Sequence, residues 1–83
     1  MSIIIRGNLT DSSLFVINPG KDAKVGDLER KIRERMDLPK NVCMNFRYGS
    51  KYRQSSTAIL DFCDINSLPI FDVTFYVDRT IDG

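Results

Sequence analysis

The sequence predicts an α+β fold in which one α-helix packs on a mixed sheet of four or five strands. Residues 25–36 carry apolar side chains at helical spacing, and the segments on both sides alternate apolar and polar residues as strands do. The 83 residues are 42% hydrophobic and 28% charged, which is typical of one small globular domain. We therefore expect residues 1–83 to form a single domain.

Two strands are expected before the helix, at residues 2–7 (SIIIRG) and 13–18 (SLFVIN). The short polar stretch between them is typical of a hairpin loop. Because successive side chains of a strand point to opposite faces, the residues expected on the helix side are Ile3, Ile5, Phe15 and Ile17. The residues expected on the outer face are Ile4, Leu14 and Val16.

The helix is predicted by four apolar residues at spacings of three, four and four, namely Val25, Leu28, Ile32 and Met36. This spacing places their side chains on one face of a helix, which can cover one face of the sheet. Pro39 disfavours helical geometry at the residue before it, so the helix should end by about Asp37.

Three segments after the helix complete the sheet. Residues 42–47 (VCMNFR) and 71–77 (FDVTFYV) alternate as strands, and residues 48–53 predict a turn that leads into a short strand. Residues 56–65 predict a loop with one helical turn. A strand, a helix and a further strand in one sheet imply a right-handed crossover.

The order of these elements resembles the ubiquitin-like, or β-grasp, family. The resemblance rests on MSIIIR at the start, VGDLERKI in the helix, Leu38–Pro39 after it, MNFRYGSKY, and the late turn LDFCDI. It extends over residues 1 to about 77 and implies a ubiquitin-like β-grasp fold. It also implies that Tyr52 is buried, and that Leu60 and Ile65 are buried anchors of the late turn.

Two departures from the family bear on function. Conjugated modifiers of this family end in Gly-Gly, whereas here the charged Asp82 precedes Gly83 and should obstruct the narrow channel of a conjugating enzyme. The outward positions that match the family's apolar binding patch hold Asn45 and Thr74. The resemblance therefore implies a non-conjugated interaction module, the N-terminal part of a larger adaptor or scaffold protein.

Two other functions stay open at this point. A free ubiquitin-like modifier would be conjugated through Gly83, and a self-associating structural domain would contact a second copy of itself. Both the adaptor and the self-association hypotheses use an apolar patch on the outer face of the sheet, which we expect to contain Ile4, Leu14, Val16 and Tyr76.

A second candidate surface for a partner is the segment RYGSKYR at residues 47–53. Its candidate residues are Arg47, Tyr48 and Lys51, because basic and aromatic side chains together can hold phosphates and stack on bases. Charged residues on a turn are more often simply solvated. Twelve basic and eleven acidic residues give a net charge of +1, which argues against a dedicated nucleic-acid or membrane-surface binder.

The sequence offers no constellation for catalysis, so we do not expect an enzyme, a cofactor or a metal site. It contains no His, and Cys43 and Cys63 are too far apart in the sequence for a CxxC pair. No apolar run approaches the ~20 residues of a membrane span, and the apolar start is too short for a signal peptide. We expect the protein in the cytoplasm or nucleus, with both thiols reduced.

Overall fold

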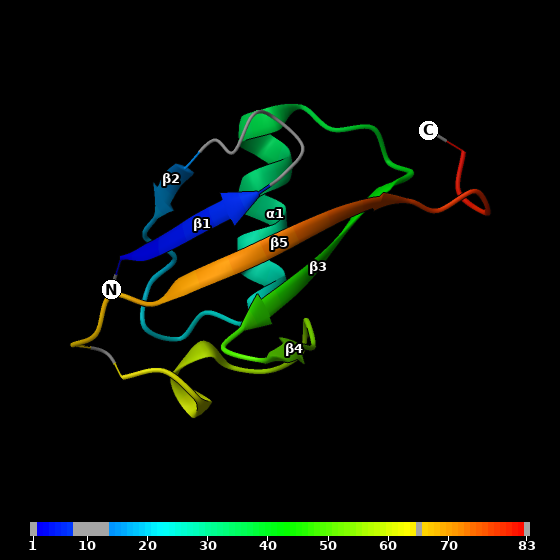
Figure 1. Ribbon diagram of the computed structural model, residues 1–83. Coiled ribbons are helices and arrows are strands. Elements are labelled where there is room, and N and C mark those ends of the chain that lie inside the picture. Colours follow the sequence, from blue (N-terminus) through cyan, green and yellow to red (C-terminus); the bar gives the residue numbers. More distant parts are fainter. Residues whose placement is uncertain (1, 8–13, 65, 83) are drawn as a thin grey trace.

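The computed structural model describes residues 2–7, 14–64 and 66–82, and its elements form two layers (Figure 1). The strands are β1 (Ile3–Gly7), β2 (Leu14–Ile17), β3 (Val42–Tyr48), β4 (Lys51–Arg53) and β5 (Ile70–Val77), and the helix is α1 (Val25–Met36). A short 3-10 turn, η1, spans Ile59–Asp61. All five strands join one sheet, and α1 lies across one of its faces. The predicted α+β fold, with one helix on a mixed sheet, is confirmed.

The sheet has the order β2-β1-β5-β3-β4. Its central pair, β1 and β5, is parallel, whereas β1–β2, β3–β5 and β3–β4 are antiparallel. The last strand therefore lies between the first strand and the strand that follows the helix. This central position allows β5 to hydrogen-bond on both edges, with β1 and with β3.

The core lies between α1 and the inner face of the sheet. The predicted helix face is confirmed, because Val25, Leu28 and Ile32 are buried and Met36 packs against the core while partly exposed. The strands contribute the other large buried side chains, which include Ile3, Ile5, Ile17, Met44, Phe46, Phe71 and Val73. The side chain of Phe15 lies outside the described residues.

The N-terminus of α1 is closed by the chain that follows β4. The N–H groups of Val25 and Gly26 donate to the carbonyls of Thr57 and Ser55, at 3.0 and 2.9 Å. A Cβ on Gly26 would lie 3.2 Å from the Ser55 oxygen, so glycine permits this close approach. Backbone donors that a helix leaves unpaired at its N-terminus are thus satisfied within the protein.

Each end of α1 also has a local signal. At the start, the Asp27 carboxylate accepts a hydrogen bond of 2.8 Å from the backbone N–H of Lys24. At the end, Asp37 adopts the left-handed conformation, with φ of 52°, and its N–H donates to the Arg33 carbonyl at 2.9 Å. The helix therefore ends where the following Leu-Pro predicts.

Two side chains that the family resemblance implies to be buried are exposed instead. Tyr52 is 64% exposed, because its register opposite Arg47 turns it to the outer face of the sheet. Leu60 is 38% exposed, and its neighbour Ile59 is fully buried as the anchor of η1. The η1 turn begins at Ile59, so the inward side chain is one residue earlier than expected; Ile65 lies outside the described residues.

Candidate functional site

The face of the sheet opposite α1 carries exposed side chains in register. Because strand partners point the same way, the pairings place outward residues in rows that run across the strands. The first row, here called the aliphatic row, consists of Val16, Ile4 and Ile70 on β2, β1 and β5. The second, the ionic row, consists of Arg6, Asp72, Arg47 and Tyr52 on β1, β5, β3 and β4.

The aliphatic row forms a continuous apolar strip. Val16 is 51% exposed and Ile70 is 40% exposed, and Ile4 between them is half-buried. With neighbouring strands about 4.8 Å apart, the strip is roughly 10 Å wide. Leu14 pairs with Arg6 through its backbone, which places it beside the ionic row, and its side chain lies outside the described residues.

Tyr76 does not extend this strip, contrary to the sequence-based expectation. It pairs with Cys43 on β3, beyond the last β1–β5 partner at Val73. Six residues separate it from Ile70 along β5, which corresponds to roughly 20 Å. Ile70, which the sequence did not single out, takes the expected place of Tyr76, because the parallel register sets Ile70 beside Ile4.

The ionic row holds two guanidinium groups on either side of one carboxylate. Arg6 donates to both Asp72 oxygens, with Nε–Oδ1 at 2.9 Å and Nη2–Oδ2 at 3.1 Å. Arg47 Nη2 lies 3.7 Å from Asp72 Oδ2, which is an ion-pair distance but longer than a hydrogen bond. Ion pairs at such exposed positions contribute at most about 1 kcal/mol. Their main effect is to fix charged groups directly beside the aliphatic row.

The remaining outward residues are polar or lie far from the aliphatic row. Asn45 and Thr74 are partners on β3 and β5, and both are exposed on the outer face, as predicted. The final row pairs Cys43 with Tyr76. The negative charge that Cys43 carries when ionised, together with desolvation and a hydrogen bond to Cys43, raises the pKa of the Tyr76 phenol.

The structure does not bring Arg47, Tyr48 and Lys51 together on one surface. Arg47 faces outward in the ionic row. Tyr48 points to the opposite side, where its ring lies 5.2 Å from the ring of Phe71, and Lys51 is its partner on β4. The two-residue turn between β3 and β4 sets this register, and partner binding by these residues stays a prediction.

On the side of the β3–β4 hairpin away from the outer face, four side chains pack together as a cluster: Tyr48, Arg53, Phe62 and Cys63. The Arg53 guanidinium lies 4.4 Å from the Phe62 ring centre, and its Nη2 donates to the Tyr48 carbonyl at 3.4 Å. Burial raises the pKa of the Cys63 thiol, although a hydrogen bond from Tyr48 and the charge of Arg53 act in the other direction. At neutral pH Cys63 is therefore a thiol rather than a nucleophilic thiolate.

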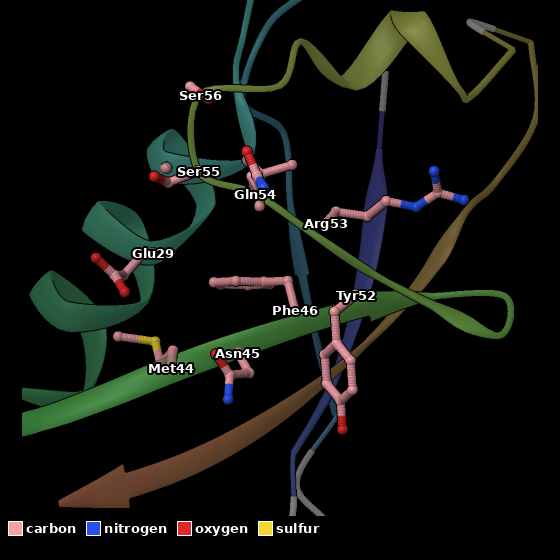
Figure 2. Close-up of a pocket in the computed structure, with 11 residues that line it drawn as sticks. Glu29, Met44, Asn45, Phe46, Tyr52, Arg53, Gln54, Ser55 and Ser56 are labelled. Carbon is pink, nitrogen blue, oxygen red and sulfur yellow. The ribbon is translucent and has the colours of Figure 1, made fainter. Parts of the chain in front are cut away.

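A groove of about 560 Å³ lies between α1 and the β3–β4 edge (Figure 2). Its floor consists of Val25, Met44 and Phe46, which are buried, and the chain at residues 54–56 forms one wall. Figure 2 shows the Glu29 carboxylate on the helix wall and the Arg53 guanidinium directed away from the groove. Among the residues that line it, Glu29 supplies a carboxylate, and Tyr52, Ser55 and Ser56 supply hydroxyl groups.

Metal ligands and membrane-spanning helices are two further features that bear on function. Within residues 2–7, 14–64 and 66–82, no three His, Cys, Asp or Glu side chains gather as metal ligands do. None of the helical segments placed by the structure has both the length and the apolar character that a membrane crossing requires. Comparison of the chain with known protein families and with curated proteins finds no match.

Proposed function

We propose that this chain is a protein-interaction module with a ubiquitin-like β-grasp fold, and that a partner docks on the aliphatic row. The strand order, with a parallel central pair and one helix on a single face, supports a β-grasp. As part of this proposal the module belongs to a non-conjugated adaptor or scaffold. It works in the cytoplasm or nucleus, where the free thiols Cys43 and Cys63 would stay reduced.

The observation that carries the proposal is the contiguity of Val16, Ile4 and Ile70 on three neighbouring strands. Single exposed aliphatic residues are normal on any protein surface, but contiguous ones are often covered by a partner. Backbone pairing on both sides of β1 and β5 holds the row in place. A partner would therefore meet a preformed surface, and little conformational entropy is lost on binding.

The proposal is tested with a Val16→Ser/Ile70→Ser double variant and a matched Val77→Ser control. Val77 is 58% exposed on the same strand as Ile70, but it lies on the helix side of the sheet. Immobilised wild type and control should capture the same proteins from a cell extract, and the double variant should lose them. Thermal unfolding of each variant checks that the fold survives.

Retention of every captured protein by the double variant would contradict docking on the aliphatic row. Light scattering of the wild type at rising concentration decides whether the partner is a second copy of the chain. A mass that grows with concentration in the wild type and the Val77→Ser control, but not in the double variant, identifies self-association through the same row.

A further inference from the structure

We propose that the partner segment carries a carboxylate beside its branched aliphatic side chains, and that Arg47 binds this carboxylate. The inference rests on the proposed function, because the aliphatic row supplies the anchor. It adds a chemical class for the partner, namely an acidic and aliphatic protein segment, and a residue that selects it.

The charges of the ionic row leave Arg47 as the excess cation. Both oxygens of Asp72 accept hydrogen bonds from Arg6, at 2.9 and 3.1 Å. Arg47 approaches the same carboxylate only to 3.7 Å, beyond hydrogen-bond range, and its side chain is 48% exposed. A guanidinium has five donors arranged as a fork that matches a carboxylate. An incoming acid can therefore form the paired hydrogen bonds that Asp72 makes with Arg6.

The position of Arg47 suits an acid that follows an aliphatic anchor closely. Arg47 is the direct partner of Asp72, so it lies diagonally across from Ile70, at roughly 7–8 Å between Cα atoms. In an extended segment, side chains two residues apart lie about 6.6 Å apart on the same face. One anchor on Ile70 and one carboxylate on Arg47 thus fit a segment with these groups at positions i and i+2.

Tyr52 supplies a second polar contact for the same acid. It is the direct partner of Arg47 on β4 and is exposed. Figure 2 shows that its ring extends away from the groove residues Gln54 and Ser55. The phenol can donate to a carboxylate that Arg47 holds.

The same charges disfavour a nucleic acid or an anionic membrane as the ligand. The ionic row has two cations and one anion, so it presents one excess positive charge beside an apolar strip. Binding to a phosphate backbone or an anionic lipid surface draws on several basic residues at once. A single Arg next to aliphatic side chains instead matches one carboxylate within a protein segment.

The test uses short synthetic peptides that contain Ile or Val at position i and Asp or Glu at position i+2. Matched peptides carry Asn or Gln at the second position. Binding to the wild type is measured by fluorescence anisotropy and compared with Arg47→Gln and with Arg79→Gln. Arg79 is an exposed arginine past the end of β5, so the control makes the same chemical change elsewhere.

We expect the acidic peptides to bind the wild type about tenfold more tightly than the amide peptides. Arg47→Gln should abolish this preference and Arg79→Gln should keep it. An equal affinity for both peptide sets, or a preference that survives in Arg47→Gln, overturns the inference.

The same experiment separates this inference from the proposed function. Peptides that bind without an acid preference, yet are lost in the Val16→Ser/Ile70→Ser variant, leave the aliphatic row as the docking surface and remove the role of Arg47. Peptides that bind this double variant as tightly as the wild type overturn both proposals. Peptides that bind neither protein overturn this inference, and the capture experiment then decides the proposed function.

Discussion

On the helix side of the sheet most of the large apolar side chains are buried against α1 or η1, whereas on the outer face the side chains stand in exposed rows. The helix side also contains the groove of about 560 Å³, and the buried residues of its floor hold the fold together. The N–H of Gly26 donates to the carbonyl of Ser55, and Phe46 and Met44 belong to the core. The outer face carries apolar surface that no described element covers. The two faces should therefore respond differently to substitution.

The largest expected effect is on the helix side, at η1. Ile59→Ala should lower the free energy of unfolding by about 3 kcal/mol, because it leaves a cavity at a fully buried position. The matched variant Leu60→Ala should cost only about 1 kcal/mol, because that side chain is 38% exposed and its loss leaves no closed cavity. Urea unfolding of both variants measures the difference. Equal losses would show that the two faces of this turn are not distinct.

Gly26→Val should have the next largest effect. The first side-chain carbon would lie 3.2 Å from the Ser55 oxygen, and the two further methyl groups of valine would add to the crowding. We expect a loss of about 2 kcal/mol in unfolding free energy. Glu34→Val places the same residue at an exposed position of α1 and controls for the lower helix propensity of valine. A loss no larger than that of the control would mean that the chain at Ser55 moves away at little cost.

Side-chain periodicity accounts for what the sequence could predict about the two faces. The spacing of Val25, Leu28 and Ile32 assigned the helix face, and alternation assigned Asn45 and Thr74 to the outer face. Both depend only on neighbours along the chain, so they are encoded locally.

The predictions that were wrong depend on strand register and turn geometry, which the neighbouring residues of a strand or helix do not determine. The parallel register of β1 and β5 determines that Ile70, not Tyr76, adjoins Ile4. This register depends on contacts between two segments that are 66 residues apart in the sequence. Turn geometry decides the other two cases. The tight β3–β4 turn sends Tyr52 outward, and the start of η1 turns Ile59 inward in place of Leu60.

The pH dependence of stability should reflect the buried thiol on the helix side. Burial raises the pKa of Cys63 above its ordinary value of about 9.0. Because the folded chain holds this proton more tightly than the unfolded chain, the resulting stability is complete below about pH 9 and is lost as the pH rises through the folded-state pKa. We expect a smaller loss than for Gly26→Val.

Cys63→Ala should flatten this alkaline decline. Cys43→Ala removes the other thiol, and it also removes the group that raises the pKa of the Tyr76 phenol. Urea unfolding under reducing conditions, at a series of pH values on both sides of 9, measures the slope. An equal slope in the wild type and Cys63→Ala would show that the thiol is as easily ionised in the folded chain as in the unfolded one.

The smallest effect on stability is expected on the outer face, at Asp72. Asp72→Asn removes the carboxylate between Arg6 and Arg47 and should cost at most about 1 kcal/mol, a loss that high salt should erase. Asp82→Asn, at an exposed position near the end of the chain, is the matched control. Unfolding at low and high salt measures the change.

Asp72→Asn should have the opposite effect on binding: it should strengthen the preference for acidic peptides although it lowers the stability slightly. Without Asp72 the guanidinium of Arg6 loses its acceptor, so two cations rather than one are available beside the aliphatic row. The preference for acidic over amide peptides should therefore increase in Asp72→Asn while the stability falls slightly. A decreased preference would instead mean that Asp72 orients Arg47 for its ligand, since removing a repulsive charge cannot weaken the attraction of an acid.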